Sequence, residues 1–192
     1  MFIFFVCDVP TLHLRRVSNR WFHPCALNLC VHSFRMNDLT DPNSNSGIFL
    51  MPGQLLARGV CRHLRSYDFV CVEELVPRPG RRVDVMALGP KGEIWIIECK
   101  SSRTDFQADH KWHDYLEWCD RYFWAVDQDF PTEILPEDTG LIIADGYGAE
   151  IVRMSEIKRI LPARRKAITL KFARHSARRA HAYRDPGVAR FT

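Results

Sequence analysis

Three residues near the middle of the chain have the types and spacing of a hydrolytic site that uses a metal ion. Asp84 lies in the apolar run 82–88, and Glu98 and Lys100 close a second apolar run, 93–100. Both runs are predicted to form central strands that are buried on both faces. Buried charges are costly unless they are paired or hold a metal ion. The charged residues in these apolar strands therefore mark the candidate functional site.

The turn between the two runs predicts how the strands pair. Its sequence, Gly-Pro-Lys-Gly at 89–92, suits a type I turn that is closed by Gly92 in the left-handed conformation. In the hairpin with this three-residue loop, Asp84 lies directly opposite Glu98, and Lys100 shares their face of the sheet. The sequence thus predicts two carboxylates and an ammonium group in one small region.

This trio suggests phosphodiester hydrolysis. Two opposed carboxylates repel each other, and a divalent cation between them removes the conflict. Oxygen ligands of this kind suit Mg²⁺ (or Mn²⁺), which keeps several waters and takes one or two carboxylates. Lys100 would orient a water, help to deprotonate it or neutralise an oxyanion, while the metal polarises a phosphoryl oxygen. The alternative is a cross-strand salt bridge between Lys100 and one of the acids.

Helical and strand periodicities predict the elements that position these residues. A capping box at 104–107 indicates a helix from Asp105 to Cys119, whose positive end would lie near the acids and could bind a phosphate. Arg103 and Lys111 are candidate phosphate contacts there. The remaining predicted elements are a helix over 53–64, strands over 69–76, 121–126, 141–144 and 149–154, and a terminal helix over 164–184.

Charge is distributed unevenly along the chain. Residues 1–152 hold 15 Lys and Arg against 21 Asp and Glu, whereas residues 153–192 hold 12 against 2. A basic end on an acidic body predicts a polyanionic partner such as DNA. Arg164, Arg165 and Lys166 are the candidate DNA contacts, and the alternative is a basic helix that is merely solvated.

Cysteine usage and hydropathy predict a cytoplasmic protein. The seven cysteines are an odd number and several fall inside predicted elements, as expected for free thiols in a reducing compartment. His23, Cys25, Cys30 and His32 match no standard zinc spacing. His110 and His113, with Asp109 and Asp114 beside them, are candidates for a second metal site, and the alternative is a group of exposed polar residues. No stretch is long and apolar enough to predict a membrane span.

The N-terminal region differs from the rest of the chain. Residues 1–50 lack clear periodicity and end in a linker-like composition at 41–47. They are predicted to be a disordered or misannotated extension, with Met36 as the hypothetical true start. The domain of interest is then 51–162, followed by a basic C-terminal helix and tail at 163–192.

The order helix, three strands, helix and strand resembles the PD-(D/E)XK nuclease superfamily, because Asp84 lies on the second strand and Glu-x-Lys on the third. It is more similar still to the MmcB-type DNA repair proteins of alphaproteobacteria, over about residues 54–175. The segments that carry this resemblance are 80–85, 92–102, 105–106, 109–112, 114–115, 119–121 and 140–145.

The resemblance implies an α/β, restriction-endonuclease-like αβββαβ core with a central mixed sheet flanked by helices. It also implies that Asp84 and Glu98 hold Mg²⁺ while Lys100 assists the attacking water. Many superfamily members add an acid from the first helix, and residues 53–66 contain none. Glu73 or Glu74 on the next strand could substitute, and Glu74 is the preferred third metal ligand.

Three functions are consistent with these patterns. The first is a Mg²⁺-dependent deoxyribonuclease in DNA repair. The second is a non-catalytic DNA-binding module or repair-complex scaffold with the same fold, which would have other repair proteins as partners. The third is a protein with no nucleic-acid role, whose charged trio is a salt bridge. No pattern in the sequence predicts an oligomeric state.

Overall fold

The computed structural model describes residues 50–188. The predictions made for residues 1–49, including the start at Met36 and the His/Cys group at 23–32, lie outside the described residues. Within the described part, the order of elements agrees with the predicted α/β class. The strands are β1 (Val70–Arg78), β2 (Arg81–Leu88), β3 (Ile94–Lys100), β4 (Arg121–Val126), β5 (Gly140–Ala144) and β6 (Ala149–Arg153).

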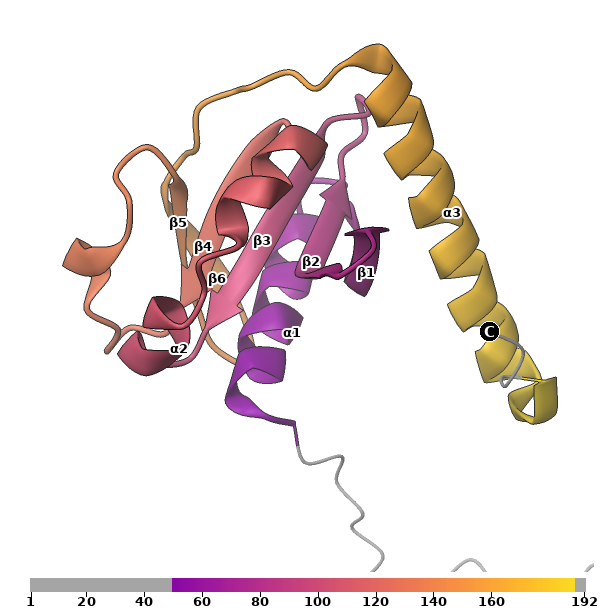
Figure 1. The fold of residues 1–192 in the computed structure, drawn as a ribbon. Helices are drawn as coiled ribbons and strands as arrows, with labels where there is room; N and C mark the ends of the chain where they lie inside the picture. Colours follow the sequence, from indigo (N-terminus) through magenta and orange to yellow (C-terminus); the bar gives the residue numbers. More distant parts are fainter. Residues whose placement is uncertain (1–49, 189–192) are drawn as a thin grey trace, which may run out of the picture. The chain divides into compact units, whose positions relative to one another are not determined.

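These six strands form one mixed sheet in sequence order, β1-β2-β3-β4-β5-β6. The β3–β4 and β4–β5 pairs are parallel, and the other pairs are antiparallel. The helix α1 (Pro52–Arg65) covers one face, and the elements α2 (Arg103–Gln107) and η1 (Trp112–Trp118) lie on the other (Figure 1). This arrangement confirms the expected restriction-endonuclease-like architecture.

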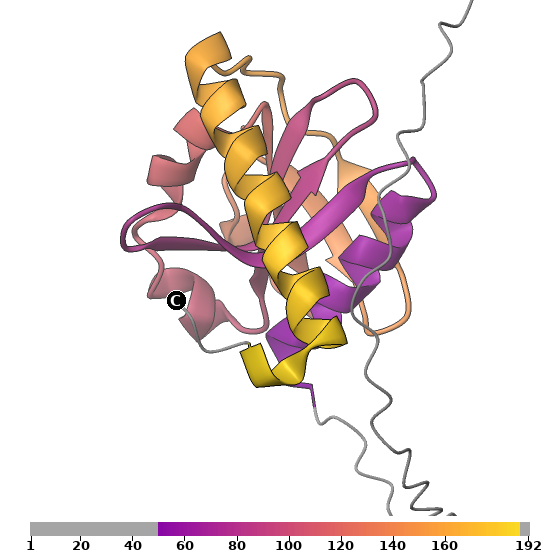
Figure 2. The same cartoon turned by 90° about the vertical axis from the view of Figure 1, so that its right-hand side faces the viewer.

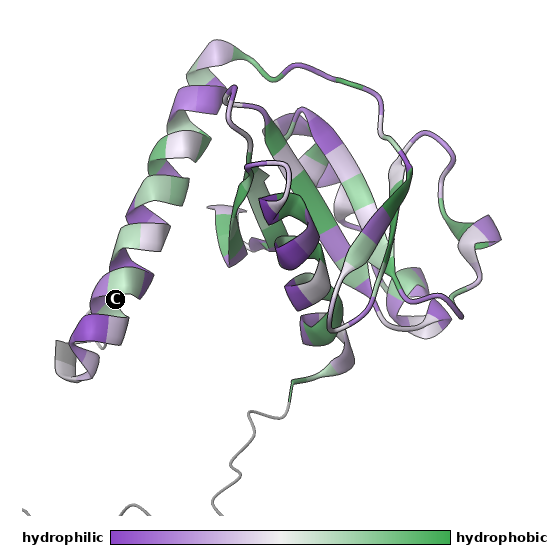
Figure 3. Cartoon of the chain, turned by 180° about the vertical axis from the view of Figure 1, so that it is seen from behind, coloured by the Kyte–Doolittle hydropathy of each residue, from purple (hydrophilic) through white to green (hydrophobic). Residues whose placement is uncertain are grey.

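Apolar side chains pack on both faces of the sheet. On the α1 face, Leu56, Val60 and Leu64 contact the central strands, and all three are buried. On the opposite face, Tyr122 and Trp124 are fully buried. Figure 3 shows the resulting concentration of hydrophobic residues in the central strands. A strand that is covered on both sides has no polar face, which is why all seven residues of β3 are buried.

The β2–β3 hairpin has the predicted turn and register. The Gly89 N–H donates to the Glu93 carbonyl at 2.9 Å, and the Gly92 N–H donates back to the Gly89 carbonyl at 3.0 Å. Gly92 has φ 81°, a conformation that side chains with a Cβ rarely adopt. The ladder continues from the turn through the pairs Leu88↔Ile94, Ala87↔Trp95 and Met86↔Ile96, and it ends at Val85↔Ile97.

The predicted helix from Asp105 to Cys119 is wrong, because the structure divides this segment in two. α2 ends at Gln107, and η1 is a separate 3₁₀ helix. The cap is also shifted, since Ser102 rather than Thr104 accepts from the Asp105 N–H. Tertiary contacts account for the division: the Tyr115 hydroxyl donates to the Arg82 carbonyl at 2.9 Å, and Asp114 accepts from Arg81 at 2.7 Å. These contacts hold η1 against β2.

The terminal helix α3 (Pro162–Arg184) confirms the predicted basic helix and covers an edge of the sheet. It lies beside β1 in the two views of Figures 1 and 2. Lys171 donates to the Pro77 carbonyl at 2.6 Å, and Arg179 donates to the Glu73 carbonyl at 2.9 Å. Side chains of α3 therefore satisfy carbonyls of an edge strand that would otherwise be open to pairing. Among residues 50–188, no helix combines the length and apolar character needed to cross a bilayer.

Candidate active site

The site is built where β2 and β3 separate. Beyond the Val85–Ile97 pair, the two acidic side chains replace ladder hydrogen bonds. The Cys99 N–H donates to Asp84 Oδ2 at 2.8 Å, and the Asp84 N–H donates to Glu98 Oε1 at 3.2 Å. Each carboxylate thus accepts a hydrogen bond from the opposite strand, and the second oxygen of each has no hydrogen-bond partner among the described residues. The predicted opposition of Asp84 and Glu98 is present.

Burial disfavours the charged form of both acids. Glu98 is only 4% exposed, and Asp84 is partly buried. Loss of solvation, followed by the negative charge of Asp84, raises the pKa of Glu98 well above its ordinary value. Burial also raises the pKa of Asp84, although the hydrogen bond from Cys99 and the charge of Lys100 oppose it. Ionisation of both carboxylates is therefore unfavourable, and a cation bound between them would stabilise the ionised pair.

Lys100 is held by a carboxylate that the sequence analysis did not assign to it. Its Nζ lies 2.7 Å from Asp109 Oδ2, and the two side chains are only 8% and 15% exposed. Burial alone would lower the pKa of Lys100, but the hydrogen bond and charge of Asp109, with the charge of Glu98, raise it overall. Burial likewise opposes ionisation of Asp109, yet the hydrogen bond from Lys100 lowers the pKa of that carboxyl. Lys100 is therefore a firmly charged ammonium group.

The break between α2 and η1 makes this pair possible. Asp109 lies in the short connection between them, where Asp109 Oδ1 also accepts from the Lys111 N–H at 3.0 Å. In an uninterrupted helix over 105–119 this connection would not exist. The signal in the sequence that could have revealed Asp109 is its place in segment 109–112, one of the segments that carry the family resemblance.

An aromatic wall closes the site on the side of the sheet opposite α1. The Lys100 ammonium lies 5.7 Å from the centroid of the Trp124 ring, a distance that allows a cation–π contact. Trp124 also packs edge-on against Phe106 and Tyr122. The Trp124 Nε1 and the Tyr122 hydroxyl are buried without a hydrogen-bond partner. The ammonium therefore lies beside one indole ring, and only 8% of the Lys100 side chain is exposed to water.

Glu74 lies apart from the two central acids. Its side chain is 57% exposed and approaches Arg82 at 3.5 Å. Its φ of 58° departs from strand geometry and turns this residue away from the regular alternation of β1. No group of three or more His, Cys, Asp or Glu side chains within residues 50–188 is arranged to hold a metal ion. Glu74 therefore forms no three-carboxylate group with Asp84 and Glu98 in the described part of the chain.

The DNA contacts predicted from the sequence divide into exposed residues and residues that are held in ion pairs. Arg103, Lys111 and Lys166 are exposed. Arg164 instead pairs with Glu117 at 2.9 Å, and Arg165 pairs with Asp120 at 2.6 Å. Those two arginines connect α3 to the body. Exposed cations that lack an ion pair in the described residues lie further along α3, and they include Arg174 and Arg178.

The His110 and His113 pair does not form a second metal centre. His113 stacks on Trp112 with ring centroids 3.7 Å apart, and Asp109 beside the pair is held by Lys100. Asp114 is held by Arg78 and Arg81. These acids serve ion pairs.

The sheet, its flanking helices and the two acids at the separating strands define a mixed α/β protein with a restriction-endonuclease-like architecture. Residues 50–187 match the family model described as DNA repair protein MmcB-like, and the chain belongs to this family. A solved structure of a protein of unknown function from Silicibacter pomeroyi is similar, with 67% sequence identity and a TM-score of 0.73. The match covers 74% of this chain and 99% of that one. No curated protein matches.

Proposed function

We propose that the protein is a Mg²⁺-dependent deoxyribonuclease that hydrolyses phosphodiester bonds during DNA repair. The observation that carries this proposal is the crossed arrangement of Asp84 and Glu98 beside the charged Lys100, in which each acid keeps one oxygen without a hydrogen bond from residues 50–188. Membership of the MmcB-like family supports DNA as the partner.

The donor set fits a hard divalent cation. Asp84 and Glu98 would hold Mg²⁺ through their free oxygens, with water completing the shell. When bound, the ion supplies Lewis-acid polarisation of a phosphoryl oxygen and lowers the pKa of water near it. Manganese(II) favours the same oxygen ligands and would replace it.

Lys100 has one consistent role in this scheme. Since Asp109 keeps it protonated, it would donate hydrogen bonds to the phosphate and stabilise the negative charge that develops in the transition state. An ammonium that is already charged cannot accept a proton from water. Of the roles first considered for Lys100, neutralising an oxyanion therefore fits best, and acting as a base fits least.

Cleavage of duplex, single-stranded, flap and branched DNA with Mg²⁺ tests the proposal. The expected result is that wild type cuts at least one substrate, whereas Asp84→Asn and Lys100→Ala lose activity by roughly 100-fold or more, the scale of a lost transition-state donor. Asp84→Asn retains an oxygen for the Cys99 N–H, which favours folding. Glu133→Gln, which removes an exposed carboxylate elsewhere, is the matched control and should cut normally.

A second function, DNA binding or repair-complex scaffolding without cleavage, is favoured by one specific observation. The described residues provide two carboxylates for the metal, and Glu74 faces Arg82 instead. If this function holds, DNA binding weakens with salt, survives Asp84→Asn and occurs without cleavage in any divalent cation. Glu74→Gln distinguishes a metal site of two carboxylates from one that includes Glu74. If Glu74 is a third ligand, Glu74→Gln should reduce cleavage as much as Asp84→Asn does.

A further inference from the structure

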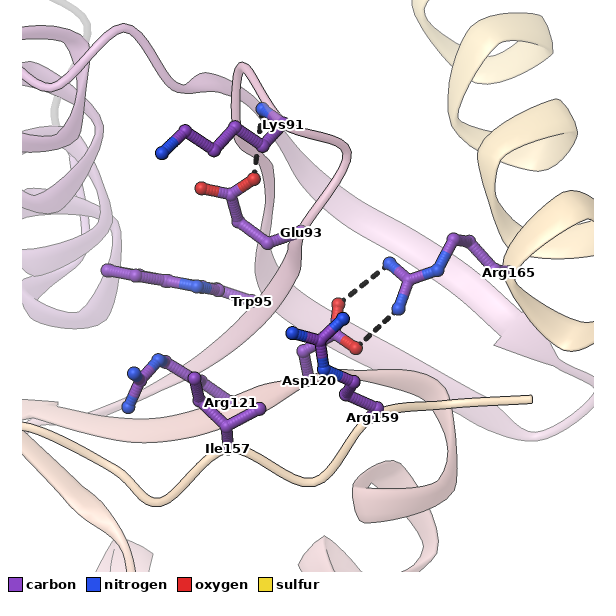
Figure 4. A pocket seen from close by; sticks show the side chains of 8 residues that line it. All are labelled: Lys91, Glu93, Trp95, Asp120, Arg121, Ile157, Arg159 and Arg165. Atoms are coloured by element: carbon purple, nitrogen blue, oxygen red, sulfur yellow. Dashed lines mark hydrogen bonds and ion pairs between the residues drawn. The ribbon is translucent and has the colours of Figure 1, made fainter. Parts of the chain in front are cut away.

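A pocket lies at the opposite end of β3 from the acids. It encloses about 420 Å³ and is formed where the β2–β3 turn, the starts of β3 and β4, the connection to α3 and the first turn of α3 meet (Figure 4). We call it the turn pocket. Its lining residues are Lys91, Glu93, Trp95, Asp120, Arg121, Ile157, Arg159 and Arg165.

Asp120 and Arg165 form the rigid frame of the turn pocket. Arg165 donates to both oxygens of Asp120, at 2.8 and 2.6 Å, and to the Gly92 carbonyl at 2.6 Å. Asp120 also accepts from the N–H groups of Ile94 and Ile160. Because these donors satisfy the Asp120 carboxylate, it does not pair with Lys91, Arg121 or Arg159.

Those other cations outnumber the one remaining acid. Lys91 and Arg159 are exposed, and their charged groups have no ion pair or hydrogen bond within residues 50–188. Arg121 donates one N–H to the Ser155 carbonyl, and its other guanidinium N–H groups have no partner within residues 50–188. Glu93 accepts from the backbone N–H of Lys91 at 3.0 Å. Three cations against one carboxylate make a pocket that attracts anions.

The turn pocket also offers apolar surface. In Figure 4, Trp95 lies between Lys91 and Glu93 on one side and Arg121 and Ile157 on the other. Ile157 is 56% exposed. Unpaired cations next to an apolar rim suit a phosphate ester that carries a sugar, because the cations take the phosphate and the rim packs against carbon.

We propose that the turn pocket holds a backbone phosphate of DNA away from the phosphodiester that lies at Asp84 and Glu98. This inference rests on DNA being the substrate, as proposed above. Trp95 packs on the α1 face of the sheet, whereas Lys100 contacts Trp124 on the opposite face. The pocket and the acids would therefore contact separate parts of the DNA, and the cations of the pocket would add to affinity without reading sequence.

Fluorescence anisotropy with labelled DNA, without divalent cation so that no cleavage occurs, tests the turn pocket. Arg159→Ala should weaken binding of a duplex of about 20 base pairs roughly fivefold at about 0.15 M salt. It should also reduce the slope of the logarithm of the binding constant against the logarithm of the salt concentration by about one. Lys91→Ala should act alike. Arg65→Ala is the matched control, since Arg65 is exposed at the end of α1 and does not line the pocket.

The loss should be specific to the cations of the turn pocket. Equal losses in Arg159→Ala and Arg65→Ala would overturn the proposal. Arg159-dependent binding of a free nucleotide as tight as that of DNA would also overturn it. Wild type that binds DNA but never cuts it leaves the turn pocket supported and removes only the nuclease.

Discussion

At the scale of single residues, the site depends on how burial and neighbouring charges set proton affinities. Glu98 and Asp84 have raised pKa values because they are removed from water, whereas Lys100 gains proton affinity from Asp109. Both acids therefore favour the neutral form in the absence of a cation, and Lys100 favours the charged form. Two predictions follow from these opposite shifts, one for stability and one for the rate of cleavage.

The free energy of unfolding of the metal-free protein should fall as the pH rises above the ordinary Glu98 pKa of 4.5. Because the folded state holds this proton more tightly than the unfolded state, each pH unit up to the raised pKa costs at most about 1.4 kcal/mol. Glu98→Gln should remove this loss, so that urea unfolding in EDTA at pH 8 shows a more stable protein. Glu133→Gln is the control. If the free energy of unfolding of Glu98→Gln depends on pH as steeply as that of wild type, Glu98 is not the group whose pKa is raised.

Asp109→Asn should change the pH profile of cleavage. Without the negative charge of Asp109, burial lowers the pKa of Lys100, so that activity should decline at a lower pH than in wild type. The rate of DNA cleavage measured from pH 6 to 10 checks this, with Glu133→Gln, which removes an exposed carboxylate elsewhere, as the control. A purely structural role for Asp109 would reduce the rate equally at every pH.

At the scale of elements, one buried carboxylate ties several segments together. Asp120 precedes β4 and joins the start of β3, the connection to α3 and α3 itself. Burial opposes ionisation of Asp120, but the hydrogen bonds from Arg165, Ile94 and Ile160 outweigh it and lower its pKa. The position of α3, and with it the covering of the β1 edge, depends on this residue.

Asp120→Ala should lower the free energy of unfolding by about 3–5 kcal/mol, because it breaks a buried ion pair and leaves two backbone donors unpaired. Urea denaturation at pH 7 measures the loss. Asp138→Ala, which removes an exposed aspartate without a partner in the described residues, should stay within about 0.5 kcal/mol of wild type. A comparable loss in both variants would show that Asp120 has no special role.

At the scale of the whole molecule, basic residues are divided between holding the fold and facing solvent. Arg165 belongs to the first class, whereas Arg174 and Arg178 on the exposed length of α3 belong to the second. Figure 3 shows that α3 is largely hydrophilic beside the apolar sheet. Exposed cations on one helix are available to a polyanion at little cost in stability.

Arg174→Ala and Arg178→Ala should therefore weaken DNA binding and reduce its salt slope by about one each. Their unfolding free energies should change by less than about 0.5 kcal/mol. Arg165→Ala should instead lower the free energy of unfolding by about 3 kcal/mol or more, because Asp120 is left buried and unpaired. Salt-dependent anisotropy and urea denaturation of the three variants measure both effects. Normal binding in Arg174→Ala and Arg178→Ala would exclude α3 from the DNA interface.

The sequence by itself determined the β2–β3 hairpin and hence the meeting of Asp84 with Glu98, because turn chemistry and alternation act over a few residues. It also indicated the order of elements and the basic α3, since both follow from local periodicity and composition. Only the tertiary structure decided that the segment 105–119 breaks, that Asp109 holds Lys100, and that Arg165 serves Asp120. Each of those outcomes depends on side chains from different elements meeting in space, and ion pairs of this kind leave no periodic trace in the chain.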